Sequence, residues 1–141
     1  MRLRTSLRRV VVGVDGSPNS LAALRRAVRE AHERQAAIEV VRVLPGTPGR
    51  LARIRGWLAL RAIAARIVPM EQQFTTRLRV ASGSPAEVLN RASEYAEALL
   101  IGARAQTAAR GPLGGEVLGN LRTRPGCELI ICADHATAPR D

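Results

Sequence analysis

Short apolar runs alternate with amphipathic segments along the whole chain. Four of these runs are almost continuously apolar, which is typical of strands in a parallel sheet that is covered on both faces. A fifth segment, residues 74–81, alternates apolar and polar positions and therefore predicts a strand with one exposed face at a sheet edge. The four continuous runs are residues 10–14, 38–44, 99–102 and 127–132.

The segments between the apolar runs have the three- and four-residue spacing of helices. Residues 20–35 form an amphipathic pattern, and residues 51–68 form a second helical segment with an apolar stripe. A third helix is predicted to begin after Ser84 as the N-cap, with Glu87 in the capping-box position. A short last helix is predicted over Glu116–Arg122. The stripe of the second helix consists of Leu51, Ile54, Leu58, Ala62 and Ala65.

This alternation of strands and helices predicts an α/β fold with a five-stranded, mostly parallel sheet and helices on both faces. Ligands of such sheets bind beyond the carboxyl ends of the strands, where the strand order reverses. Loops begin there at Asp15 and at Gly102. The second loop re-enters a helix near residues 112–115, an arrangement that exposes backbone N–H groups and commonly binds phosphate. We expect one domain over residues 9–134, preceded by a basic extension (residues 1–8) and followed by a tail (residues 135–141).

The net charge of +10 changes the range of expected partners. All 22 basic residues are arginine, a side chain that pairs well with the phosphates of nucleic acids or anionic membranes. The arginines are nevertheless spread along the chain among acidic residues. Aromatic residues that could stack on bases make up only 2% of the sequence. This distribution favours codon bias in a GC-rich genome as the explanation of the arginine content, rather than a nucleic-acid-binding surface. We therefore expect no specific nucleic-acid partner.

Several other classes of function are not supported. The chain has no apolar run near the roughly 20 residues that span a bilayer, and the run after the basic N-terminus is too short for a signal peptide. We therefore expect a cytoplasmic location and no membrane partner. Cys127 and Cys132 lie five residues apart in one predicted strand, so they should face opposite sides and stay unpaired. Metal-ligand spacing and a catalytic constellation are both absent, which argues against an enzyme, although weak ATP hydrolysis is left open.

Four segments together resemble the universal stress protein (UspA-like) family over residues 8–134. They are VVVGVDGSPNS, IEVVRVL, ASGSPAEVLNRASEYAEALLIGA, and the stretch from Gly102 to GCELIIC. The resemblance implies an adenine-nucleotide α-hydrolase-like sheet with strand order 3-2-1-4-5. It also implies a homodimer through residues 128–132, the apolar strand ELIIC that is expected at a sheet edge.

The resemblance also implies roles for residues near the point where the strand order reverses. In nucleotide-binding members, the aspartate after the first strand lies near the ribose and adenine, and Asp15 matches it. The alternative role of Asp15 is that of a turn residue before the helix. A valine late in the second strand meets the adenine through its backbone, and Val43 matches this position.

The phosphate motif of the family is only partly present. The family has Gly, two residues, Gly, nine residues, Gly, then Ser or Thr. Counting from Gly102, Ala105 replaces the second glycine, Gly115 matches the third, and Glu116 replaces the hydroxyl residue. A carboxylate at this place would repel a triphosphate, and Arg104 beside the loop would offset part of that charge. Glu116 has an alternative role as a carboxylate at a helix N-terminus. The alternative role of Gly102 and Gly115 is to allow a tight turn without any phosphate contact.

These features favour a regulatory or stress-response domain with weak or modified binding of ATP or AMP. The alternative is a dimeric interaction module of the same fold that binds no nucleotide. Two further classes of function are considered. Turnover assays would test a nucleotide-hydrolysing enzyme, and a binding titration against salt would test an arginine-rich nucleic-acid binder.

Overall fold

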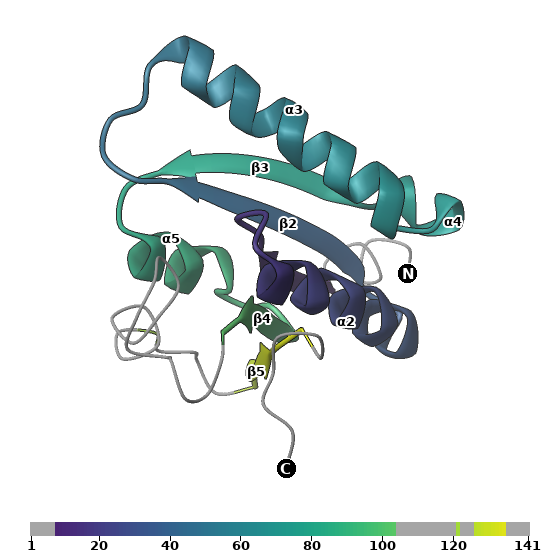
Figure 1. Ribbon diagram of the computed structural model, residues 1–141. Coiled ribbons are helices and arrows are strands. Elements are labelled where there is room, and N and C mark those ends of the chain that lie inside the picture. Colours follow the sequence, from purple (N-terminus) through teal and green to yellow (C-terminus); the bar gives the residue numbers. More distant parts are fainter. Residues whose placement is uncertain (1–7, 104–120, 122–125, 135–141) are drawn as a thin grey trace.

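Five parallel strands form one sheet in the order β3-β2-β1-β4-β5 (Figure 1). The computed structural model describes residues 8–103, 121 and 126–134. The expected fold class and strand order are confirmed. The strands are β1 (Arg9–Gly13), β2 (Ala37–Leu44), β3 (Arg77–Ser82), β4 (Ala98–Gly102) and β5 (Glu128–Cys132).

The helices of the described part cover both faces of this sheet. They are α2 (Pro18–Arg34), α3 (Arg50–Ile67), the single turn α4 (Met70–Gln73) and α5 (Pro85–Ala92). The helices α2 and α3 pack on one face, whereas α5 packs on the other. The helix predicted over residues 116–122 lies outside the described residues, apart from Leu121, which is buried on the α5 side.

Aliphatic side chains fill two core layers, one on each face of the sheet. Successive residues of a strand point to opposite faces, so the continuous apolar runs of β1 and β4 supply both layers. The cysteines confirm this alternation, because Cys127 packs in the α5 layer and Cys132 against the opposite one, both as free thiols. The layer under α2 and α3 includes Val10, Val12, Leu24, Ile38, Val40, Leu60 and Leu100. The layer under α5 includes Val11, Val41, Leu89, Leu99 and Ile101.

The edge strand β3 is shorter than predicted. It begins at Arg77 rather than at Phe74. The residues just before Arg77 continue the turn of α4, because the Thr75 N–H donates a hydrogen bond to the Gln72 carbonyl (3.3 Å). Phe74 is consequently 89% exposed. Within β3 the predicted alternation holds, since Leu78 packs on the core and the arginines stay exposed.

The helix α3 has nearly the predicted bounds, but the predicted apolar stripe faces away from the sheet. Gly56, Leu60 and Ala64 are the residues that α3 buries, whereas the side chain of Leu58 is 52% exposed. Leu60 is fully buried in the core layer below α3. At Gly56 the helix backbone lies close to β2, since a Cβ there would be in van der Waals contact with Leu44 Cδ1 at 3.5 Å.

The start of α5 agrees with its predicted position and differs in its capping bond. Ser84 is the N-cap residue and Pro85 takes the first helical position, but the Ser84 side chain makes no capping hydrogen bond. The backbone nevertheless turns into the helix, since the Val88 N–H donates to the Ser84 carbonyl (2.9 Å).

Candidate functional site

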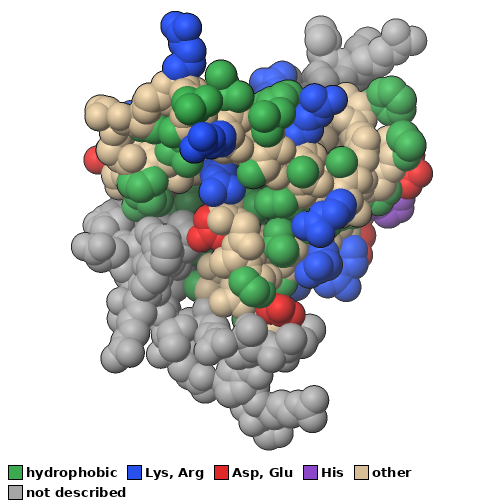
Figure 2. Space-filling model, turned by 45° about the horizontal axis from the view of Figure 1, so that its top comes forward, with side chains coloured by type: hydrophobic (Ala, Val, Ile, Leu, Met, Phe, Trp, Pro, Cys, Tyr) green, Lys and Arg blue, Asp and Glu red, His purple; other side chains and the backbone are tan. Residues whose placement is uncertain are grey.

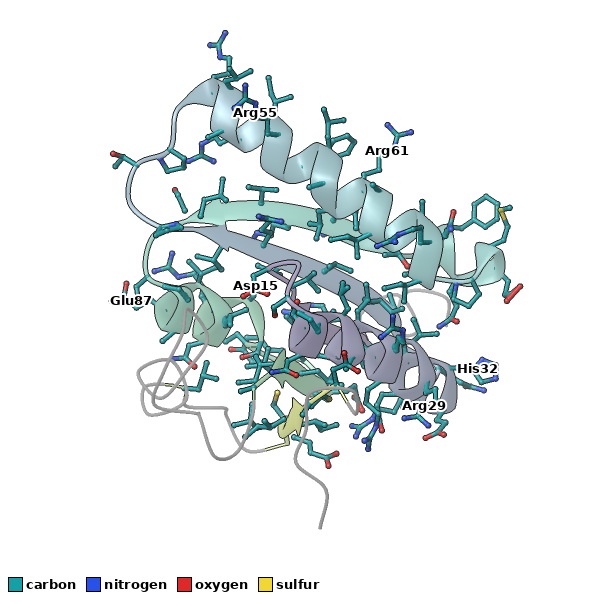
Figure 3. All side chains as sticks on the ribbon, in the orientation of Figure 1. Asp15, Arg29, His32, Arg55, Arg61 and Glu87 are labelled. Atoms are coloured by element: carbon teal, nitrogen blue, oxygen red, sulfur yellow. The ribbon has the colours of Figure 1, made fainter. Side chains whose placement is uncertain are left out.

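The strand order reverses between β1 and β4, and the candidate site lies at the carboxyl ends of these two strands. β1 pairs with β2 on one side and with β4 on the other, with Val12 beside Leu100. Asp15 follows β1 by two residues, and Gly102 is the last residue of β4. Both therefore lie at the edge where α/β sheets bind their ligands. Figure 3 places Asp15 in the loop between β1 and α2.

A small hydroxyl network holds the start of α2 in place at this edge. Ser17 is the N-cap residue, and its Oγ accepts a hydrogen bond from the Ser20 N–H (3.3 Å). The Ser20 hydroxyl donates to the Ser17 carbonyl (2.9 Å) and accepts from the Asp15 N–H (3.2 Å). Because Ser20 is fully buried, these bonds are protected from water and give the loop one defined shape.

Asp15 is a half-buried carboxylate that takes part in this turn. Its Oδ1 accepts a hydrogen bond from the Ser17 N–H (2.9 Å), the geometry of an Asx turn. Partial burial raises the pKa of the carboxyl group, but hydrogen bonds from Ser17 and Ser20 outweigh it, and the net pKa is lowered. Asp15 is thus ionised at neutral pH. Asp15 therefore has the turn role that the sequence analysis gave as its alternative. Contact between Asp15 and a ribose stays a prediction.

Val43 lies near the end of β2, beside the space beyond β1. The Val14 N–H donates to the Val41 carbonyl (2.9 Å), so the peptide groups of Val41 point toward β1. Peptide groups of alternate residues in a strand point the same way. Those of Val43 therefore also point toward the β1 side, although β1 itself ends at Gly13. A backbone contact between Val43 and adenine stays a prediction.

Gly102 is the place where α2 approaches the sheet most closely among the described glycines. A Cβ on this residue would lie 2.2 Å from the carbonyl carbon of Asn19 and 2.3 Å from the Ser20 nitrogen. Both are backbone atoms of the first turn of α2, so no side-chain movement could relieve the overlap. Glycine here permits close helix–strand packing, a more specific structural role than the turn geometry considered from the sequence.

Asn19 is a residue of this site that the sequence analysis did not identify. Its Oδ1 accepts a hydrogen bond from the Asp134 N–H (2.8 Å), 115 residues away. The start of α2 is thereby fixed to the chain segment after β5 as well as to β4. An asparagine in the first turn of a helix carries no sign of such a distant partner, so a single sequence could not reveal it.

The phosphate half of the predicted site falls outside the described residues. Arg104, Ala105, Gly115 and Glu116 all belong to the segment 104–120. Their roles therefore stay predictions from the sequence. In the described part of the chain, no group of three or more His, Cys, Asp or Glu side chains could hold a metal ion.

The comparison with protein families matches the Universal stress protein family over residues 6–133. No curated protein matches the chain. A universal stress protein from Archaeoglobus fulgidus has a similar structure (TM-score 0.66, 22% identity, covering 89% of this chain and 93% of that one).

Two further solved structures were determined with adenine nucleotides. One is a universal stress protein in complex with cAMP (TM-score 0.64, 22% identity, 90% of this chain and 97% of that one). The other is the Archaeoglobus fulgidus protein in complex with dAMP (TM-score 0.65, 21% identity, 89% and 97%). At these identities the likeness concerns the fold alone. The family match spans nearly the whole sequence, and the chain therefore belongs to the universal stress protein family.

Proposed function

We propose that this protein binds an adenine mononucleotide weakly at the carboxyl ends of β1, β2 and β4, as a regulatory domain without catalytic turnover. The observation that carries the proposal is that an ionised carboxylate, Asp15, follows β1, while the peptide groups of Val43 near the end of the neighbouring β2 point toward the β1 side. An ionised carboxylate accepts hydrogen bonds from ribose hydroxyls, and peptide groups can pair with the edge of adenine. The structures with cAMP and dAMP support the ligand class.

The proposed ligand is a monophosphate because of the sequence of the phosphate loop. Glu116 stands where the family pattern has Ser or Thr. A carboxylate a few ångströms from phosphate costs on the order of 1–4 kcal/mol at effective dielectrics of about 20 to 80. This cost grows with the charge of the ligand, so AMP is favoured over ATP.

The second candidate function is a dimeric interaction module that binds no nucleotide. It is favoured by the bond between Asp15 Oδ1 and the Ser17 N–H, because the carboxylate already stabilises the loop without a ligand. In either case we propose a homodimer through β5. Within the described residues β5 pairs only with β4, and Ile131 is 49% exposed.

Calorimetric titration with AMP, cAMP and ATP tests the nucleotide proposal. Asp15→Asn keeps an acceptor for the Ser17 N–H but removes the charge. Loss of a charge-assisted hydrogen bond to the ribose should weaken AMP binding about tenfold to hundredfold. Glu33→Gln is the matched control, since it removes one exposed carboxylate on α2 away from the site.

The same titration with Glu116→Ser tests the preference for a monophosphate. This variant should strengthen ATP binding more than AMP binding. Absence of heat with every nucleotide, together with no adenine absorbance released from the denatured protein, would favour the interaction module. Tight ATP binding by the wild type that Glu116→Ser leaves unchanged would contradict our interpretation of Glu116.

A further inference from the structure

The outward face of α3 is apolar and strongly basic at once. Leu51, Ile54 and Leu58 are 60%, 48% and 52% exposed, and Trp57 beside them is 39% exposed. Figure 2 shows hydrophobic and arginine side chains interspersed at the top of the view, over α3. Exposed apolar side chains grouped on one face of a helix commonly mark a binding site.

The arginines of α3 lie on both sides of this apolar stripe. At about 100° per residue, Arg50 and Arg61 fall on one flank, and Arg55 and Arg66 fall on the other. Figure 3 shows Arg55 and Arg61 pointing away from the sheet. All five arginines of the helix, these four and Arg53, are exposed.

The helix α3 carries no acidic residue beside these arginines. The sequence contains neither Asp nor Glu between Glu39 and Glu71, and Glu39 is buried on the opposite face of the sheet, paired with Arg9 and Arg79. The arginines of α3 therefore have no carboxylate partner on their own helix. Elsewhere the pattern differs, since Arg26 and Arg34 of α2 are paired with Glu30.

Trp57 and Arg61 form a cation–π contact on the same face. The guanidinium carbon of Arg61 lies 5.5 Å from the centre of the indole ring. Such a pair keeps an amphipathic ring and a cation together at the surface. Tryptophan and arginine are both favoured at the boundary between lipid headgroups and acyl chains.

We propose that the outward face of α3 docks on an anionic lipid bilayer. The stripe of Leu51, Ile54 and Leu58 would enter the headgroup boundary, and the flanking arginines would bind lipid phosphates. Charge complementarity selects this occupant. A second copy of the chain would bring arginine against arginine, and a nucleic acid would leave the apolar stripe unused.

This proposal departs from the expectation of no membrane partner. That expectation rested on the lack of a spanning segment, and the described residues indeed contain no helix long and apolar enough to cross a bilayer. An interfacial helix lies in the membrane plane and needs no such segment. Five of the arginines lie within the 18 residues of α3, and the way this helix packs leaves them exposed.

The chain contains a single tryptophan, Trp57, so its fluorescence reports on this face directly. The test uses vesicles of equal parts phosphatidylglycerol and phosphatidylcholine, with pure phosphatidylcholine vesicles as the neutral comparison. We expect co-sedimentation with the anionic vesicles and a blue shift of the tryptophan emission. Both should weaken as salt is added, because the attraction is partly electrostatic.

Two variants separate the contributions of charge and apolar surface. Arg55→Gln combined with Arg61→Gln should weaken binding about tenfold or more, and Leu58→Glu should abolish the blue shift. The matched control is Arg25→Gln combined with Arg29→Gln, which removes the same charge from exposed positions of α2. Circular dichroism checks that each variant keeps its helix content.

Several results would overturn the proposal. Equal binding to neutral vesicles would remove the role of charge, and an equal loss in the α2 control would reduce the effect to net charge. Binding of heparin as tightly as of anionic vesicles, with no blue shift on either, would indicate a general polyanion surface. A change of oligomeric state in Leu58→Glu, measured by light scattering, would identify a second copy as the occupant.

Discussion

At the residue scale, the packing of α2 on the sheet depends on the missing side chain of Gly102. The backbone atoms of Asn19 and Ser20 occupy the space that a Cβ would need. The same first turn carries the N-cap of Ser17 and the bond from Asn19 to Asp134. A shift of this turn would therefore disturb three attachments and the loop that holds Asp15.

Gly102→Ala should destabilise the fold more than an ordinary overpacked core residue. Overpacking costs about 1–3 kcal/mol, and here the overlap is with backbone that cannot rotate away. Urea denaturation measures the free energy of unfolding. Gly49→Ala is the control, because a Cβ there meets no atom within 4 Å. Equal stability of the two variants would mean that α2 lies farther from β4.

At the element scale, an ion-pair network joins α2 to the last strand. Glu30, which is 9% exposed, pairs with Arg26 (2.8 Å) and Arg34 (3.0 Å). Arg34 also pairs with Glu128 of β5 and donates to the Glu97 carbonyl (3.2 Å). β5 is a short edge strand whose backbone pairs with β4. The ion pair between Arg34 and Glu128 adds a side-chain attachment of β5 to α2.

Glu30→Gln should lower the stability by about 1–3 kcal/mol at neutral pH, because the hydrogen bonds from the partly exposed Arg26 and Arg34 lose their charged acceptor. The bond from Arg26 lowers the pKa of Glu30, although burial opposes this. A lowered pKa means that the ionised form stabilises the fold. That contribution is complete above the ordinary pKa of 4.5 and is lost as the pH falls through the lowered value.

Thermal unfolding of wild type and Glu30→Gln at neutral and acidic pH measures this effect. The difference between the two proteins should shrink as the acid end is approached. The control Glu33→Gln changes an exposed carboxylate of the same helix and should alter stability little. A stability difference between wild type and Glu30→Gln that stays constant with pH would mean that the substitution acts through packing and not through the charge of Glu30.

At the scale of the whole molecule, the two surfaces that we propose for association both lie among the described residues. One is the free edge of β5 and the other is the outward face of α3. They lie on different elements, and their chemistry differs. The edge offers backbone hydrogen bonds beside Ile131, whereas α3 offers arginine and an apolar stripe.

Ile131→Asp should shift the proposed homodimer toward monomer, because it places a charge beside an apolar edge strand. Ile131 is 49% exposed, so the substitution leaves the core intact, whereas Ile130 is buried and would not be a suitable position. Sedimentation equilibrium measures the dimer dissociation constant. Ile54→Asp is the control on α3, and a dimer disrupted only by that variant would place the interface there.

Much of the fold and part of the candidate site could be predicted from the sequence. Apolar runs identified the strands, and turn residues identified the loops at Asp15 and Gly102, because these signals depend on neighbours along the chain. The strand order came from the family resemblance. The placement of Asp15 and Val43 at the carboxyl ends then followed from the parallel sheet, while Arg104, Gly115 and Glu116 lie outside the described residues.

The sequence by itself determined which residues share a face of each helix and strand, since that depends only on the local repeat. It did not determine which face is covered. In α3 the sequence predicts the stripe containing Leu58 as the apolar face, whereas the structure buries the face of Leu60. The tertiary structure decided between them: Leu60 is fully buried in the core layer under α3, and Gly56 brings the backbone of the helix close to Leu44 of β2. The contacts of Asn19 with Gly102 and Asp134 were likewise decided only by tertiary structure, since they join segments far apart in the chain.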